Sequence, residues 1–286
     1  MAEKFSIDGN IIGTTADNVE YGKDGWSEAT NLKAAIDDLH LRLTDIELNG
    51  GGGSSDDDII QVSGTWVSFG DSITALNDGR GISSQWVTKG YQDRVMEKIQ
   101  FSNFHNYAYS GYRAYQYSTE IGWMNDDEVV PDYVTWLFGT NDYYQYSTKG
   151  TLDDYIAGTN ATYASRTRNF VDAIKAINPN VKIILCTFPK RGGGSSAADI
   201  PHWWVQHRST YQAEWADVIL QIADYDSRID GVCDFFNLPM SNDSTLYNAS
   251  DPSKGLLYDG THPSDLGMQR MADMLIETFK KVLSDE

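Results

Sequence analysis

The chain has 286 residues, which is enough for one large domain and a small additional segment. It carries 41 Asp and Glu residues against 22 Lys and Arg residues, a formal net charge of -19 at pH 7. This charge opposes binding to nucleic acid, whose phosphates are held by clustered Lys and Arg, and docking on anionic lipid. No stretch reaches the length of a membrane span, so we expect no membrane insertion. The first residues lack the apolar run of a secretory signal, so we expect a protein that is not exported by that route, that is already processed, or that is released by other means such as cell lysis.

The first element predicted in chain order is a helix with an apolar seam. Its apolar residues are spaced four, three, four and three apart, which is the a/d pattern of a coiled coil: Leu32, Ile36, Leu39, Leu43 and Ile46. Ser27 suits the N-cap of this helix, and Asn49-Gly50 suits its end. A helix this short is marginal alone in water, so the seam needs a partner. Self-association and packing on the rest of the chain are the two alternatives.

A stretch rich in glycine, serine and aspartate follows at residues 49–58. Such a composition cannot bury a core and predicts a flexible connector. We therefore divide the chain into an N-terminal segment at 1–48, a linker at 49–58 and a main domain at 59–286.

In the main domain, apolar strand-like runs alternate with amphipathic stretches. Strands are predicted at 66–69, up to about 109, and at 133–138, 181–188 and 232–236, and helices at 86–99, 163–177, 209–223 and 265–283. This alternation predicts an α/β fold, a three-layer α/β/α sandwich with a mostly parallel central sheet. Open sheets of this kind bind ligands beyond the carboxyl ends of their strands.

The first predicted strand of this domain runs into Gly70-Asp71-Ser72-Ile73-Thr74. A serine at the turn from a buried strand to a helix lies beside backbone N–H groups that have no helical partner. This position suits a nucleophile of acyl transfer. Gly-Asp-Ser is also ordinary turn chemistry, so the pentapeptide alone leaves both interpretations open.

Three further blocks follow in order: Asn106-Tyr107-Ala108-Tyr109-Ser110-Gly111, Gly139-Thr140-Asn141-Asp142 and Asp259-Gly260-Thr261-His262-Pro263. Together with the first block, and in this order, they resemble the SGNH hydrolases, also called GDSL-type esterases, over about residues 61–286. The resemblance implies a flavodoxin-like α/β fold and a carboxylic ester hydrolase that uses no cofactor and no metal ion.

The resemblance also assigns a role to one residue of each block. Ser72 is the expected nucleophile, His262 its general base, and Asp259 the carboxylate that orients the imidazole. The expected oxyanion hole consists of the backbone N–H of Ser72, the backbone N–H of Gly111 and the side-chain amide of Asn141. Each residue type has an ordinary structural explanation alone, but their joint occurrence in this order favours the catalytic one.

Aromatic residues crowd these blocks and bear on the substrate. Aromatic faces with polar tips suit stacking on sugar rings, although core packing is the alternative for each of them. The tryptophans at 203 and 204 are expected in a long loop after glycines 192–194. The side chains expected to bind substrate are Asp71, Tyr112, Tyr143, Trp203 and Trp204.

We therefore hypothesise a serine esterase that removes acyl groups, O-acetyl above all, from carbohydrate such as a bacterial surface glycan. A lipase or thioesterase with the same site, or a virion module that binds glycan without turnover, are the alternatives.

A second resemblance concerns the N-terminal segment. Residues 14–21 and 31–39 resemble short modules at the N-termini of bacteriophage tail and fibre proteins, which commonly precede receptor-binding or enzymatic domains in trimeric assemblies. The resemblance implies a homotrimer formed through residues 27–47, other virion proteins as partners, and a location on a phage tail or outside the cell after lysis. A cytoplasmic location is the alternative.

Both cysteines, Cys186 and Cys233, lie in strand-like runs, where buried free thiols are favoured over a disulfide. Metal-ligand spacing is absent from the sequence. The acidic run at 56–58 suits a solvated linker, and His202 and His207 have no obvious ligand partner.

Overall fold

The computed structural model describes residues 5–7, 10–12, 59–75, 87–144, 147–159, 161–191, 202–238, 245–247 and 255–284; residues 5–7, 10–12, 202–211 and 245–247 are described by their backbone alone. The chain divides into two compact units, 1–56 and 57–286. In the first unit, strands β1 (Phe5–Ile7) and β2 (Asn10–Ile12) pair antiparallel. The helix predicted through residues 27–47 and the linker predicted at 49–58 lie outside the described residues.

A five-stranded parallel sheet forms the centre of the second unit, in the order β4-β3-β5-β6-β7. The chain enters at β3, adds β4 on one side and then adds the other three strands on the opposite side. The direction of winding therefore changes between β3 and β5, where such sheets open a crevice for ligands. The strands are β3 (Ile60–Gly70), β4 (Ile99–Asn106), β5 (Tyr133–Leu137), β6 (Lys182–Cys186) and β7 (Gly231–Cys233).

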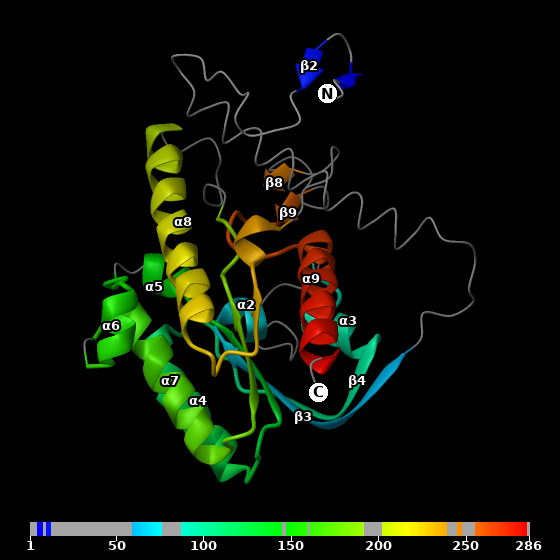
Figure 1. Ribbon diagram of the computed structural model, residues 1–286, viewed down its shortest axis with the longest axis vertical. Coiled ribbons are helices and arrows are strands. Elements are labelled where there is room, and N and C mark those ends of the chain that lie inside the picture. Colours follow the sequence, from blue (N-terminus) through cyan, green and yellow to red (C-terminus); the bar gives the residue numbers. More distant parts are fainter. Residues whose placement is uncertain are drawn as a thin grey trace, which may run out of the picture. The chain divides into compact units, whose positions relative to one another are not determined.

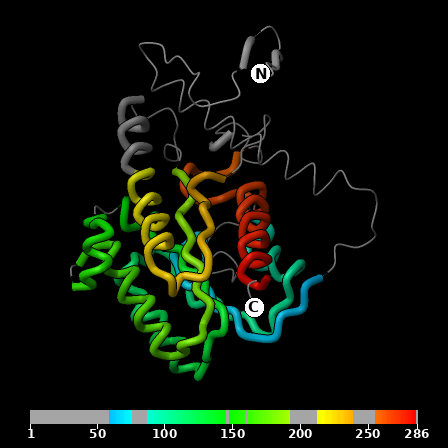
Figure 2. The backbone as a smooth tube through the Cα atoms, viewed as in Figure 1, coloured from blue at the N-terminus to red at the C-terminus, as the bar shows by residue number. Residues whose placement is uncertain are grey.

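Helices cover both faces of this sheet (Figures 1 and 2). On one side lie α3 (Tyr91–Met96) and α9 (Asp265–Ser284). On the other side lie η3 (Ala114–Gln116), α4 (Tyr117–Asp126), α6 (Leu152–Ala157), α7 (Tyr163–Ile177) and α8 (His202–Tyr225). The short elements are α2 (Ser72–Ala75), α5 (Thr140–Tyr144), η4 (Phe235–Asn237) and the parallel pair β8 (Thr245–Tyr247) and β9 (Gly255–Leu257).

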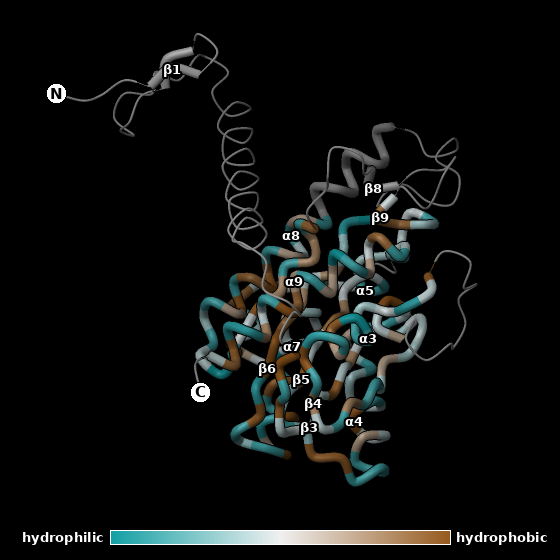
Figure 3. Tube along the Cα trace, turned by 90° about the vertical axis from the view of Figure 1, so that its right-hand side faces the viewer, coloured by the Kyte–Doolittle hydropathy of each residue, from teal (hydrophilic) through white to brown (hydrophobic). Residues whose placement is uncertain are grey.

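The alternation of side chains along β3 explains the three layers. Successive residues of a strand point to opposite faces. Trp66 packs on Phe279 of α9 with 5.2 Å between ring centroids, whereas Phe69 packs on Phe170 of α7 at 5.3 Å. All four rings are fully buried. Figure 3 shows hydrophobic residues concentrated along the central strands β5 and β6, so both faces of the sheet contribute to the core.

The predicted three-layer α/β/α fold is confirmed, and two local predictions are corrected. The helix predicted at 86–99 is the shorter α3, because the chain turns at residues 97–98 and begins β4 at Ile99. Trp203 and Trp204 do not lie in a loop, because α8 begins at His202. The sequence from 202 to 225 contains no glycine or proline, and a proline at 201 suits a helix start.

The two cysteines face each other in register across β6 and β7, and both are buried free thiols.

Candidate active site

The turn that carries Ser72 is held tightly against the end of β5. A Cβ atom added at Gly70 would lie 2.6 Å from the carbonyl oxygen of Leu137, so only glycine fits there. Asp71 Oδ1 accepts a hydrogen bond of 3.0 Å from the backbone N–H of Ile73, which closes the turn into α2. Ser72 is 6 % exposed and opens this helix, directly after the carboxyl end of β3.

A chain of hydrogen bonds connects Ser72 to the loop after β9. Ser72 Oγ lies 2.9 Å from His262 Nε2, and His262 Nδ1 lies 2.7 Å from Asp259 Oδ2. A carboxylate only accepts, so Nδ1 carries the proton and Nε2 is left to accept from the serine hydroxyl. This is the tautomer that a general base for Ser72 needs.

Asp259 is itself held by the loop that it orients. Its other oxygen, Oδ1, accepts from the backbone N–H groups of Thr261 and His262 at 2.8 and 2.7 Å. Burial alone would raise the pKa of Asp259, but the hydrogen bonds and charge of His262 and these two N–H donors outweigh it and lower the pKa below its usual value. Asp259 is therefore ionised at neutral pH. The ring of Tyr258 stacks on the His262 imidazole, with 5.8 Å between centroids.

The residues expected to form the oxyanion hole follow neighbouring strands. Gly111 comes after β4 and adopts φ +84°, a conformation that favours glycine. Asn141 comes after β5, and its Nδ2 donates a hydrogen bond of 2.9 Å to the carbonyl oxygen of Tyr112. One amide hydrogen of Asn141 is thus fixed to the Gly111 loop, and the amide has a second hydrogen to offer an oxyanion. Because β4, β3 and β5 are adjacent, Gly111, Ser72 and Asn141 gather at one edge of the sheet.

Comparison with known proteins agrees with this arrangement. Residues 68–270 match the model of the GDSL-like Lipase/Acylhydrolase family. The chain belongs to this family. No curated protein matches the chain.

Solved structures with the same fold include two described as lipases and one described as a carbohydrate esterase. A possible lipase from Chitinophaga pinensis is 26 % identical, with a TM-score of 0.60, and the match covers 77 % of this chain and 98 % of that one. A family 3 carbohydrate esterase from Clostridium thermocellum is 18 % identical, with a TM-score of 0.50 and coverage of 78 % and 98 %. An extracellular lipase from Streptomyces rimosus is also 18 % identical, with a TM-score of 0.50 and coverage of 75 % and 99 %.

Beneath the site of this GDSL-like family member lie three buried carboxyl groups. Glu120 of α4 accepts a hydrogen bond of 3.2 Å from the backbone N–H of Gly70, at the end of β3. Asp142 of α5 accepts one of 2.8 Å from the backbone N–H of Ala114, after the Gly111 loop. Burial raises the pKa of all three, to about 7 for Asp71, to about 6 for Asp142 and well above the usual range for Glu120. Each carboxyl thus stabilises a loop that carries a site residue.

The positions of these carboxyls correct the role predicted for Asp71 and add Glu120 to the residues that support the site. Asp71 is fully buried, which argues against the direct substrate contact predicted for it. Sequence reasoning missed Glu120 altogether. In the sequence, the only sign that Glu120 is buried is its position beside Ile121 and before Met124, the other two buried residues of α4.

The aromatic side chains predicted to bind substrate occupy different surroundings. Tyr112 is half-buried and packs beside Tyr109 and Trp123 at the Gly111 loop. Tyr143 packs on Phe188 and Trp215, with centroid distances of 6.4 and 6.3 Å, so its ring belongs to the edge of the core. Trp203 and Trp204 are described only by their backbone, in the first turn of α8.

A cation that the sequence did not single out lies beside the histidine loop. Arg191 follows β6, and its Nη2 donates a hydrogen bond of 2.7 Å to Thr261 Oγ1, next to His262. Its guanidinium also lies over the ring of Tyr144, 4.6 Å from the centroid. Arg191 therefore connects the loop after β6 to the loop that carries the histidine.

Within the described part of the chain, no group of three or more His, Cys, Asp or Glu residues could hold a metal ion. No helix in that same part is long and apolar enough to cross a membrane.

Proposed function

We propose that the chain is a serine ester hydrolase that removes acyl groups, O-acetyl above all, from carbohydrate. The observation that carries the reaction type is the hydrogen-bonded series Ser72, His262 and Asp259, with distances of 2.9 and 2.7 Å. Serine is a weak nucleophile until a base takes its proton, and this arrangement supplies that base.

The reaction follows from the geometry in two halves. Ser72 Oγ attacks the ester carbonyl while His262 Nε2 takes the hydroxyl proton, and Asp259 stabilises the imidazolium that forms. The oxyanion accepts from the backbone N–H groups of Ser72 and Gly111 and from the amide of Asn141. His262 then gives the proton to the leaving alcohol as its C–O bond breaks. A water molecule attacks the acyl-serine in the same way and releases the carboxylic acid and the serine.

Carbohydrate is favoured as the substrate by the aromatic residues near the site. Three of the large apolar side chains that remain exposed, Tyr109, Tyr115 and Tyr144, follow β4 and β5, the strands that lead to Gly111 and Asn141. Tyrosine offers a flat face for a sugar ring and a hydroxyl for its polar edge, whereas a fatty acyl chain is better matched by aliphatic residues. The solved neighbours include a carbohydrate esterase and lipases, so the fold alone does not choose between them.

The test compares wild type with Ser72→Ala on p-nitrophenyl acetate and on acetylated oligosaccharides. Ser102→Ala, which changes an exposed serine on β4, is the matched control. We expect Ser72→Ala to lose at least about 10³-fold in kcat, with the control unchanged. Equal rates in Ser72→Ala and wild type would refute the assigned nucleophile. Activity confined to long-chain esters would refute the carbohydrate substrate and favour a lipase.

The N-terminal segment is the subject of a separate proposal that rests on its sequence. The apolar seam within residues 27–47 predicts a homotrimer, and the resemblance to phage tail modules suggests attachment to a virion with other virion proteins. Light scattering on the full chain and on a chain that begins at Ile59 tests the association. A single-chain mass for both at micromolar concentration would contradict it.

A further inference from the structure

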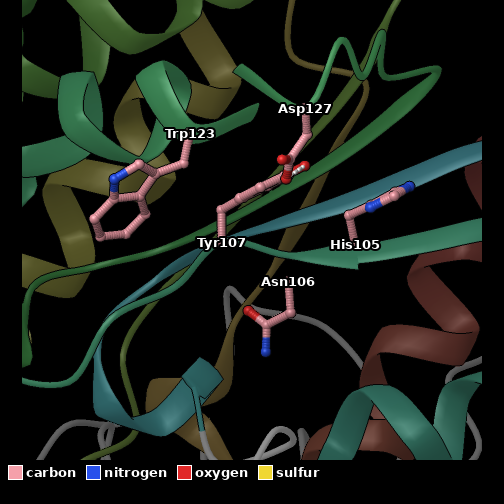
Figure 4. Close-up of a pocket in the computed structure, with 5 residues that line it drawn as sticks. All are labelled: His105, Asn106, Tyr107, Trp123 and Asp127. Carbon is pink, nitrogen blue, oxygen red and sulfur yellow. Dashed lines mark hydrogen bonds between the residues drawn. The ribbon is translucent and has the colours of Figure 1, made fainter. Parts of the chain in front are cut away.

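A pocket of about 320 Å³ lies beside the carboxyl end of the edge strand β4, outside the triad and the oxyanion loop. Its lining comes from two elements, as Figure 4 shows. His105 and Tyr107 are two residues apart and share one face of the strand and its extension. Trp123 lies in the last turn of α4, and Asp127 is the residue that caps the C-terminal end of this helix. Asn106 completes the lining.

The polar groups of this pocket are arranged around one carboxylate. The hydroxyl of Tyr107 donates a hydrogen bond of 2.9 Å to Asp127 Oδ2. Burial and this hydrogen bond raise the pKa of Tyr107, so the phenol stays neutral. Asp127 is exposed, and its carboxylate can accept further hydrogen bonds. The half-buried imidazole of His105 lies parallel to the Tyr107 ring, within 6°, and offers both a donor and an acceptor.

The side chain of Asn106 takes no part in this polar surface. Its Nδ2 donates to the carbonyl oxygen of Thr74, and its Oδ1 accepts from the backbone N–H of Ala108. Asn106 therefore holds β4 against the α2 turn. Tyr107 is only 7 % exposed, so the side chains that can face a ligand are the partly exposed Trp123 and His105 and the exposed Asp127.

Aromatic contacts connect the pocket to the proposed oxyanion loop. Trp123 packs on Tyr112 with 5.9 Å between centroids and an interplanar angle of 26°, and on Tyr109 at 5.8 Å. Tyr109 and Tyr112 flank Gly111, and the carbonyl of Tyr112 accepts from Asn141. Trp123, which lines the pocket, thus contacts the tyrosines on both sides of Gly111.

We propose that this pocket binds one neutral sugar unit of the substrate. This unit is the neighbour, along the glycan, of the sugar whose ester lies at Ser72. This inference rests on the proposed carbohydrate ester hydrolase. The volume lies at the lower end of the range for small-ligand sites. The indole of Trp123, the imidazole of His105 and the carboxylate of Asp127 match the flat ring and the hydroxyl edges of a pyranose.

The same residues disfavour two other occupants. A fatty acyl chain would take Asp127 out of water and leave its carboxylate with the hydrogen bond from Tyr107 alone, which is costly. An acidic sugar would place a second carboxylate in the same pocket as Asp127, and two like charges held close together repel each other.

The test separates the pocket from the reacting centre by substrate size. Acetylated neutral xylo- and cello-oligosaccharides of one to four units are compared with p-nitrophenyl acetate, which carries no sugar unit. We expect Asp127→Ala to lower kcat/KM on the longer oligosaccharides about tenfold or more, and to change p-nitrophenyl acetate hydrolysis less than twofold. Asp126→Ala, a neighbouring exposed carboxylate that does not line the pocket, is the matched control. Thermal unfolding of each variant confirms that it is folded.

A second measurement does not depend on turnover. Ser72→Ala protein is titrated with unacetylated xylo- and cello-tetraose, and binding is compared with that of Ser72→Ala/Asp127→Ala. Binding that weakens tenfold in the double variant supports the subsite even if no carbohydrate ester is hydrolysed, an outcome that refutes only the proposed function. Ester hydrolysis that is independent of oligosaccharide length, with no effect of Asp127→Ala, overturns the subsite and leaves the proposed function standing. Absence of both binding and hydrolysis overturns both.

Discussion

Asp259→Asn tests how this site chooses its histidine tautomer. In the structure, one oxygen of Asp259 accepts from His262 Nδ1–H and the other accepts from the backbone N–H groups of Thr261 and His262. An asparagine has one carbonyl oxygen and one NH₂ group, so it cannot satisfy both sides. If the oxygen faces the backbone, the NH₂ group faces Nδ1, and the imidazole proton moves to Nε2. Nε2 then cannot accept the proton of Ser72.

The opposite orientation keeps the active tautomer at a cost. It directs the NH₂ group at two backbone N–H donors, and each donor left unpaired costs roughly 1–3 kcal/mol. The total of roughly 2–6 kcal/mol disfavours the active tautomer by about 30-fold to more than 10⁴-fold. Loss of the negative charge beside the imidazolium adds to this. We therefore expect kcat to fall by about 10²–10⁴ with the fold unchanged.

The assay is kcat on p-nitrophenyl acetate, with imidazole ¹⁵N spectra as a direct readout of the tautomer. Wild type should show a protonated Nδ1 on His262, and Asp259→Asn a protonated Nε2. Asp234→Asn serves as the control, because Asp234 accepts hydrogen bonds from Thr187 and Asn237 after β7 without contacting the histidine. A loss of less than tenfold in Asp259→Asn, or an unchanged tautomer, would refute the reasoning.

Three further predictions address the surroundings of the triad. Asn141→Ala removes the proposed oxyanion donor and the hydrogen bond to the Tyr112 carbonyl, and should lower kcat about 10²–10³-fold with a smaller effect on KM, measured by steady-state kinetics. The pKa of Asp71, about 7 when folded, means that the folded state keeps a proton that the unfolded chain releases above about pH 4. Wild-type stability should therefore fall as pH rises from 4 to 7, and Asp71→Asn should gain up to about 4 kcal/mol relative to wild type between pH 4 and pH 8 in urea unfolding. Parallel curves of unfolding free energy against pH for wild type and Asp71→Asn would contradict this. Gly267→Ala would place a Cβ 2.1 Å from the carbonyl oxygen of Leu256, and should cost about 1–3 kcal/mol in urea unfolding, whereas wild-type stability would show that α9 shifts freely.

The layers of the fold were predictable because the pattern along the chain is regular. Apolar strands such as β5 and β6 are buried on both faces, and their sequences show no polar alternation. The helix at 163–177 was predicted with its observed bounds, since its apolar face repeats with helical spacing. Short helices were harder to predict from the sequence. The segment 117–126 lacks a clear apolar stripe, and its burial depends on packing against the end of β3.

The meeting of Ser72, His262 and Asp259 in one hydrogen-bonded series was predictable from the order of the four blocks and the family that they resemble. The residues around them were not. Glu120 and Arg191 act through contacts with segments 50 and 70 positions away in sequence, and no local pattern marks such contacts. The pocket beside β4 was missed for the same reason. His105 and Asp127 belong to different elements, and only the fold brings them together.

The buried carboxyls help to hold the segments that follow β3, β4 and β5 in one geometry. Ordering a loop costs about 1–2 kcal/mol per residue in backbone entropy, so a preorganised site needs contacts that restrict each loop. Glu120 fixes the end of β3, Asp142 the segment after Gly111, and Asp71 its own turn. A neutral carboxyl is far less costly to bury than an ionised one, which is consistent with the raised pKa values. Ionisation of these groups at rising pH would strengthen the individual N–H hydrogen bonds but would bury a charge in each place, and desolvation is the larger effect, so the stability of these turns falls as pH rises.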